Sequence, residues 1–262
     1  MKKNLYYRTV YKRTNLVKET ILAYVQAFSS YPRLLLEVFI RRNFGERYFS
    51  FSGAITILAI LIILPFYWEF GWAVFDERFF RYINHHINWG NFLGHYFTWY
   101  LFLAGFLYMS LKREAEVSRL PSVYDFKRFS LSTGLIHPRF YDLKLNGKYP
   151  SERTISIWLE PGLFFGIGFL LWVLDQELGS LLIICSIIYS LSYSASYHQG
   201  DNFVMDKIDE MICNEELVKA FVHDRNSDET RGFSFQGRRP ADPETRRKVA
   251  ETFVEDDLFL AL

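Results

Sequence analysis

Four long apolar stretches constrain this chain more than any other feature. Each is close to the roughly 20 helical residues that cross a bilayer core about 30 Å thick, and each carries few charges. A mainly helical, polytopic membrane protein is therefore the predicted fold class. The four stretches, which we predict to be transmembrane helices, are Ala54–Phe75, Asn91–Leu111, Ile155–Leu174 and Gly179–Tyr197.

Charge is distributed unevenly along the chain, although the formal net charge is only +1. Residues 1–50 hold ten Lys or Arg against three Glu, whereas residues 198–262 hold nine Lys or Arg against fifteen Asp or Glu. Opposite ends of this kind indicate a basic arm facing the membrane and an acidic tail facing solvent or a partner. Five segments follow: an arm 1–50, a first transmembrane pair 51–111, a loop 112–154, a transmembrane hairpin 155–197 and a tail 198–262.

The connecting segments orient the predicted helices. The loop 112–154 holds nine basic residues, whereas the loop 76–90 holds two, and the short connection Asp175–Leu178 holds none. Cytoplasmic loops are the ones enriched in Lys and Arg. We therefore expect four transmembrane helices with both termini in the cytoplasm.

The basic arm has two segments with helical spacing of apolar residues, Thr14–Phe28 and Arg33–Phe44, separated at Pro32. The second segment is too short to cross a bilayer. We expect the second to lie in the membrane interface, with lipid phosphates bound by Arg33, Arg41 and Arg42. Packing of this helix on the cytoplasmic part is the alternative. At the opposite membrane face, Trp68 and Trp72 are predicted to form an aromatic belt.

Charged residues inside apolar stretches are candidate functional groups because an unpaired ion in hydrocarbon costs free energy. Glu160, which precedes Pro161 at the start of the third stretch, is the strongest candidate. It is expected to reach the interface, or to pair with Arg153 or an arginine of the arm. No ladder of charges crosses the membrane, so the usual parts of an ion pathway are missing.

Small residues favour close helix packing. Gly162 and Gly166 form a GxxxG pattern, and Ser186, Ser190 and Ser194 share one helix face at a spacing of four. They are expected to pack either the hairpin itself or a neighbouring subunit, so a homo-oligomer is possible.

The sequence contains none of the common motifs for catalysis or cofactor binding. There is no Walker A, HExxH or GxSxG pattern and no CxxC pair. A metal site at His85, His86 and His95, and a nucleophile pair of Ser194 with His198, are the weaker alternatives. We therefore predict no catalytic residue, no metal, no cofactor and no direct nucleic-acid binding.

The tail is predicted to hold a helix over Asn202–His223 and a final helix that begins after Asp242, with Pro243 in its first position. It is the expected contact surface for another membrane or cytosolic subunit. The side chains assigned to this contact are Phe203, Met211, Phe221, Arg238 and Arg239.

Three blocks of sequence resemble a known family of membrane proteins. They are NGKYPSERTISIWLEPG at 146–162, DNFVMDKIDEMICNEE at 201–216 and GRRPADPE at 237–244. They resemble membrane proteins carried on Bacteroidetes conjugative elements, which are similar to small inner-membrane partners of a type IV coupling or secretion apparatus. The resemblance implies a non-enzymatic adaptor or scaffold in the bacterial inner (cytoplasmic) membrane. It would work with a DNA-transfer ATPase. A small oligomeric transporter or channel is the alternative function.

Overall fold

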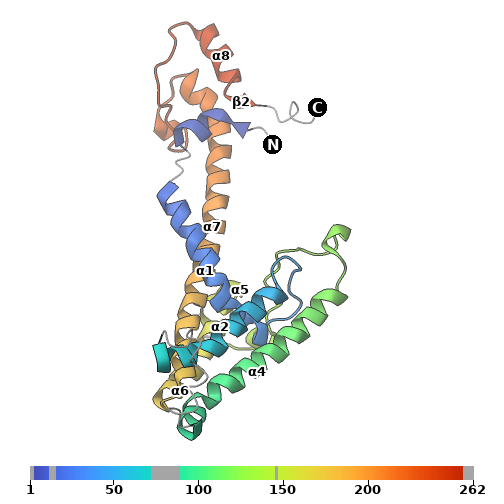
Figure 1. The fold of residues 1–262 in the computed structure, drawn as a ribbon. Helices are drawn as coiled ribbons and strands as arrows, with labels where there is room; N and C mark the ends of the chain where they lie inside the picture. Colours follow the sequence, from blue (N-terminus) through green and yellow to red (C-terminus); the bar gives the residue numbers. More distant parts are fainter. Residues whose placement is uncertain (1–2, 12–15, 72–88, 145–146, 256–262) are drawn as a thin grey trace. The chain divides into compact units, whose positions relative to one another are not determined.

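The computed structural model describes residues 3–11, 16–71, 89–144 and 147–255, and it is mainly helical (Figure 1). Trp72, His85 and His86 lie outside these residues. The long helices are α1 (Leu16–Ile40), α2 (Phe51–Phe70), α4 (Trp89–Arg119), α6 (Glu160–Val173) and α7 (Glu177–Phe221). The shorter elements are β1 (Lys3–Asn4), η1 (Tyr7–Tyr11), η3 (Val123–Asp125), η4 (Pro138–Phe140), α5 (Glu152–Thr154), η5 (Ile155–Leu159), η6 (Ser227–Glu229), α8 (Pro243–Glu251) and β2 (Val254–Glu255).

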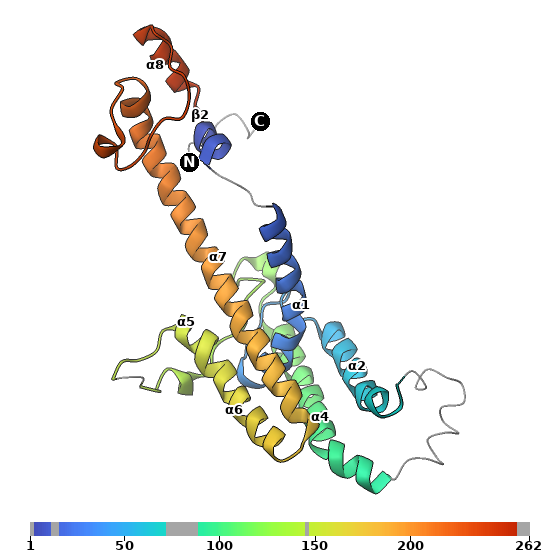
Figure 2. The same ribbon diagram turned by 90° about the vertical axis from the view of Figure 1, so that its left-hand side faces the viewer.

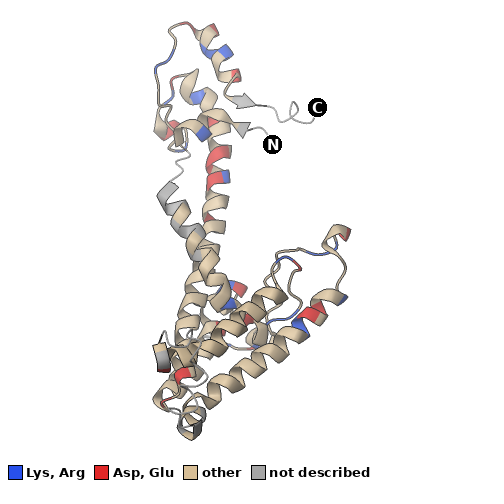
Figure 3. Ribbon diagram, viewed as in Figure 1, with Lys and Arg blue, Asp and Glu red and all other residues tan. Residues whose placement is uncertain are grey.

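Among the described helices, three are long and apolar enough to cross a membrane: Phe51–Glu69, Glu152–Val173 and Glu177–Phe221. Figure 3 shows α2 and α6 almost free of charged residues along their lengths. The predicted second stretch does form a helix, α4, but it does not reach the same apolar level. Its many Trp and Tyr residues lower its mean hydropathy. Three of the described helices are thus long and apolar enough to cross a membrane, and the predicted fourth crossing is not confirmed.

Two predicted breaks are absent. α1 runs through Pro32 without interruption, so the arm holds one long helix where two were expected. α7 is also continuous for 45 residues, which joins the predicted fourth transmembrane helix to the predicted tail helix. A single proline removes one backbone hydrogen bond, and neighbouring packing can offset that loss. His198 and Ser194 are both exposed on this continuous helix.

The chain forms two compact units. The tail unit comprises Met1–Leu22 and Ser196–Leu262, and the helical unit comprises Ala23–Ala195. In the helical unit, α6 and α7 form the expected tight antiparallel hairpin, joined through Leu174–Gln176 (Figure 2). Close approach occurs at Gly168 and Gly179, where an added Cβ would lie within 3 Å of the facing helix. Gly162 and Gly166 have open space around them, so within this unit they do not pack the hairpin.

In the tail unit, the first residues of the chain pack against its end. β1 pairs antiparallel with β2, with Asn4 opposite Val254. Next to this pair lies an aromatic core in which Tyr6 stacks on Phe235 at 4.9 Å, and Phe221 contacts Phe235 at 4.5 Å. The helix predicted after Asp242 is confirmed as α8, because the Asp242 carboxylate accepts hydrogen bonds from the first-turn backbone amides.

Asn4 is fully buried in the tail unit and hydrogen-bonded at both ends of its side chain. Its Nδ2 donates to Asn214 Oδ1 at 2.6 Å, and its Oδ1 accepts from the Tyr7 backbone N–H at 2.8 Å. Replacing Asn4 by Ala leaves these buried groups unpaired. We therefore expect the free energy of unfolding of the tail unit to fall by about 1–3 kcal/mol. The rate of proteolysis of the tail unit under native conditions would measure this change in stability. Thr9→Ala, an exposed change on the same segment, should cost less than about 0.5 kcal/mol; equal effects would contradict the expectation.

Candidate functional site

Four charged side chains, two arginines and two glutamates, are buried together in the helical unit. α1 supplies Arg33 and Glu37, and Arg41 directly follows its last residue, with the Arg41 N–H still bonded to the Glu37 carbonyl at 2.8 Å. The intervals of four residues place all three on one side of the helix axis. Glu160 comes from the first residue of α6. Glu37 and Glu160 are fully buried, and Arg33 and Arg41 are 9% and 1% exposed. We call these four residues the charge cluster.

Arg41 and Glu160 form the centre of the charge cluster. The guanidinium of Arg41 lies across both carboxylate oxygens of Glu160, with Nε 3.1 Å from each. The remaining Arg41 donors reach Ser156 Oγ at 2.9 Å and Thr133 Oγ1 at 3.0 Å. Tyr189 on α7 donates to Glu160 Oε2 at 2.7 Å. The hydrogen bonds of this ion pair thus connect the end of α1 with α6, α7 and the loop that contains Thr133.

Arg33 and Glu37 form the second pair, one helical turn apart, with Nη2 and Oε1 separated by 3.3 Å. Arg33 also donates to Ser192 Oγ at 3.0 Å and to Tyr48 OH at 2.8 Å. The Tyr48 hydroxyl in turn donates to Glu37. Burial, reinforced by the Glu37 carboxylate, raises the pKa of Tyr48, so the hydroxyl remains protonated as a donor.

Tyr193 on α7 connects the two pairs. Its hydroxyl accepts from Arg41 and donates to Glu37 Oε1 at 2.7 Å. Its ring lies between the two guanidinium groups, whose Cζ atoms are 4.2 Å (Arg33) and 4.7 Å (Arg41) from the ring centroid. Cation–π attraction of this kind strengthens when it is shielded from water. The charge cluster is therefore one continuous hydrogen-bonded network with no net formal charge.

A π-helical turn helps to place Glu160. η5 spans Ile155–Leu159 and adds a wider turn directly before α6, and Ser156 within this turn contacts Arg41. π-helical turns are rare and occur frequently at functional sites. No feature of the sequence predicted this turn.

The structure corrects several expected site residues. Arg33 and Arg41 are not at lipid phosphates, because their guanidinium groups are buried against carboxylates; Arg42 is exposed. Glu160 pairs with an arginine of the arm, as one of the alternatives proposed, and that arginine is Arg41. Trp68, expected in an aromatic belt, is 49% exposed. The sequence analysis did not identify Glu37, Tyr189 and Tyr193 as site residues. Glu37 could have been identified, because it lies four residues from each arginine, which is the spacing of an ion pair on a helix.

The side chains expected to bind a partner divide into two groups. Phe203 and Met211 are 63% and 51% exposed on α7, and Arg238 is exposed. Arg239 is engaged, with Nη1 3.1 Å from Asp224 Oδ1. Phe221 is 1% exposed in the aromatic core, so it is not available as a contact residue. The correction has a simple cause: helical periodicity identifies an apolar face but not what covers it.

Metal chemistry finds no support among the described residues, which contain no group of three or more potential metal ligands. The described member of the histidine group, His95, has Nε2 3.4 Å from Glu177 Oε1. Comparisons with protein-family models, with curated proteins and with solved structures found no match.

Proposed function

We propose that this protein is a non-enzymatic membrane scaffold, an adaptor subunit of a multi-protein machine. The observation that supports this best is the charge cluster. Every charge in it is neutralised and hydrogen-bonded by other residues of the same chain, so no ionised group is left over for a substrate. Buried ionic networks of this kind favour one specific packing arrangement over others. A fixed arrangement of helices suits a scaffold.

The proposed scaffold crosses the membrane four times, with α4 as the additional helix. α4 packs against α2, which is a membrane-crossing candidate: Trp99 Nε1 donates to the Leu61 carbonyl at 2.9 Å, and the rings of Phe66 and Phe92 lie 5.0 Å apart. The charges of α4 lie in its last turns. Lys112 is the first of these charges, and an apolar segment of about 20 residues precedes it. The loop charges favour the cytoplasmic membrane, with both termini inside.

The tail unit is the proposed contact surface for the partner, which the resemblance implies is the coupling ATPase of a conjugative DNA-transfer apparatus. Phe203 and Met211 are exposed on α7, eight residues apart and hence close to one face. Exposed apolar side chains on a helix outside the bilayer are typical of a site that another protein covers. The bilayer itself is the second partner.

Co-purification from the native membrane tests this proposal. Tagged full-length protein is extracted gently, and recovery of a coupling ATPase or other secretion subunits is the expected result. The double variant Phe203→Ser with Met211→Ser should reduce that recovery by about tenfold. Leu143→Ser, a comparably exposed change in the helical unit, should leave it unchanged. A homogeneous homo-oligomer without any partner would overturn the adaptor proposal.

A small oligomeric transporter or channel is the second candidate. It is favoured by the continuous chain of hydrogen bonds from Ser192 through Arg33, Glu37 and Tyr193 to Arg41. Ionisable residues linked in this way inside apolar helices are found in proton relays. Proton flux into liposomes containing the purified protein, abolished by Tyr193→Phe, would favour this candidate over the scaffold.

A further inference from the structure

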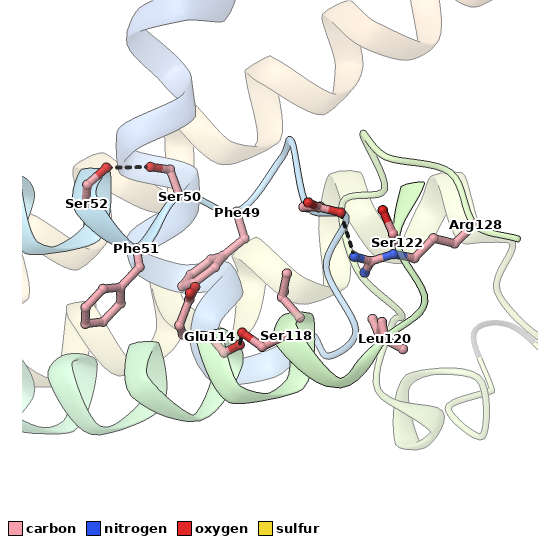
Figure 4. A pocket seen from close by; sticks show the side chains of 11 residues that line it. Phe49, Ser50, Phe51, Ser52, Glu114, Ser118, Leu120, Ser122 and Arg128 are labelled. Atoms are coloured by element: carbon pink, nitrogen blue, oxygen red, sulfur yellow. Dashed lines mark hydrogen bonds and ion pairs between the residues drawn. The ribbon is translucent and has the colours of Figure 1, made fainter. Parts of the chain in front are cut away.

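A polar cleft of about 540 Å³ lies in the helical unit between the start of α2 and the end of α4. Figure 4 shows Ser50 and Ser52 on the α2 side, Glu114 and Ser118 on α4, and Arg128 reaching in from the following loop. Its volume lies within the range of pockets that hold small molecules, about 300–1,000 Å³. It is separate from the charge cluster.

The two walls of this cleft differ in electrostatic character. On α4, the Glu114 carboxylate is half-buried and forms no ion pair with any described residue, whereas Glu46 is neutralised by Arg128 at 3.2 Å. On the other wall, α2 begins at Phe51, and Ser50 caps it by accepting from the Gly53 amide at 3.2 Å. The Phe51 and Ser52 amides remain as donors at the partially positive end of a 20-residue helix.

An unpaired carboxylate facing helix-start amides matches a ligand that carries both a cation and an anion. Glu114 fits an ammonium group with N–H donors, and the amides at the start of α2 fit phosphate oxygens. The Ser50 and Ser52 hydroxyls bond to each other at 2.9 Å, which leaves one hydroxyl hydrogen as a further donor. A purely anionic ligand would be repelled by Glu114. A quaternary ammonium has no N–H to donate to it.

The surroundings of the cleft favour a position at a lipid surface. α2 is one of the helices that can cross the membrane, so its first turn would lie at the membrane interface. The neighbouring loop exposes Tyr124, Phe126 and Phe129 by 85%, 95% and 71%, beside Lys127. Phe126 holds the left-handed conformation at φ +53°, which is unusual for a bulky residue. Aromatic and basic side chains together are typical of the interface.

We propose that this cleft binds the phosphoethanolamine headgroup of a membrane lipid, with its ammonium on Glu114 and its phosphate at the start of α2. The inference rests on the membrane placement in the proposed function. It adds a lipid-recognition site that is independent of the partner surface on the tail unit.

Lipid titration of the full-length protein in detergent, followed by native mass spectrometry, tests the site. Three lipids with the same acyl chains are compared: phosphatidylethanolamine, phosphatidylcholine and phosphatidylglycerol. We expect the first to bind about tenfold more tightly than either of the others. Glu114→Gln should reduce this preference to about twofold or less. Asp125→Asn removes the same charge from the neighbouring exposed loop, outside the cleft, and should keep the full preference.

Equal binding of the three lipids by the unmodified protein, or a preference that survives Glu114→Gln, would overturn the proposal. Soluble phosphoethanolamine forms a separate arm: if it binds as tightly as the lipid, a membrane lipid is the wrong source. Partner recovery is measured on the same variants. If Glu114→Gln loses the lipid preference but recovers the partner fully, the lipid site and the partner surface are independent. If the unmodified protein shows no lipid preference but recovers the partner fully, the lipid site is wrong and the proposed function stands.

Discussion

Replacing Arg41 by Gln lowers the free energy of unfolding of the helical unit by about 3–5 kcal/mol, because it leaves a buried carboxylate without its counter-charge. Glu160 is fully buried and would keep only the Tyr189 hydroxyl as a strong donor. The amide of Gln reaches fewer acceptors than the guanidinium, so Ser156 and Thr133 lose partners as well. Chemical denaturation in detergent micelles, followed by tryptophan fluorescence, measures the change.

Arg42 provides the matched control because it is the adjacent arginine and is exposed. Arg42→Gln removes the same charge from the same segment and should change stability by less than about 0.5 kcal/mol. If both arginines stood at lipid phosphates, the two variants would behave alike. Similar effects in the two variants would therefore contradict the buried position of Arg41.

A double-mutant cycle separates the ion pair from general damage. Glu160→Gln alone strands the Arg41 guanidinium and should also cost about 3–5 kcal/mol. In the double variant, neither residue is charged, so the combined loss should be smaller than the sum of the two single losses by at least about 1 kcal/mol. Additive losses would show that the two side chains contribute independently.

Much of the helical architecture could be predicted from the sequence because its signals are local. Long apolar stretches predicted α2, α6 and the first part of α7, and the Asp-Pro-Glu pattern predicted the start of α8. Breaks between helices were harder to predict. Pro32 and the Gln199–Asp201 segment have weak helical propensity, yet α1 and α7 continue through them. Tertiary packing overrides local propensity at such positions.

The charge cluster could be predicted only in part, as one of two alternative pairings of Glu160, because Glu160 lies far along the chain from the three residues of the arm. The spacing of Arg33, Glu37 and Arg41 places them on one side of a helix, but it does not show what that side contacts. The basic character of the arm instead suggested a lipid surface. Only the pairing with Glu160, 119 residues from Arg41 along the chain, distinguishes a buried arginine from an interfacial one.

Replacing Gly179 by Ala should destabilise the α6–α7 hairpin by about 3 kcal/mol, at the upper end of the usual cost of overpacking. A Cβ at this position would lie 2.3 Å from the Trp172 backbone N and 2.6 Å from the Gly168 carbonyl oxygen. Both are backbone atoms, so neither can move aside by changing rotamer. The two helices would have to separate, and thermal unfolding in micelles should begin at a lower temperature.

Gly162→Ala makes the same chemical change on α6, where a Cβ meets nothing within 4 Å. It should stabilise the helix by about 0.5–1 kcal/mol, since Ala restricts the unfolded chain more than Gly does. The two glycine variants are thus expected to change the stability in opposite directions. A destabilising Gly162→Ala, accompanied by a change from a larger species to the monomer, would mean that the GxxxG pattern contacts another subunit. The open space around Gly162 within one chain would then be filled by a second copy.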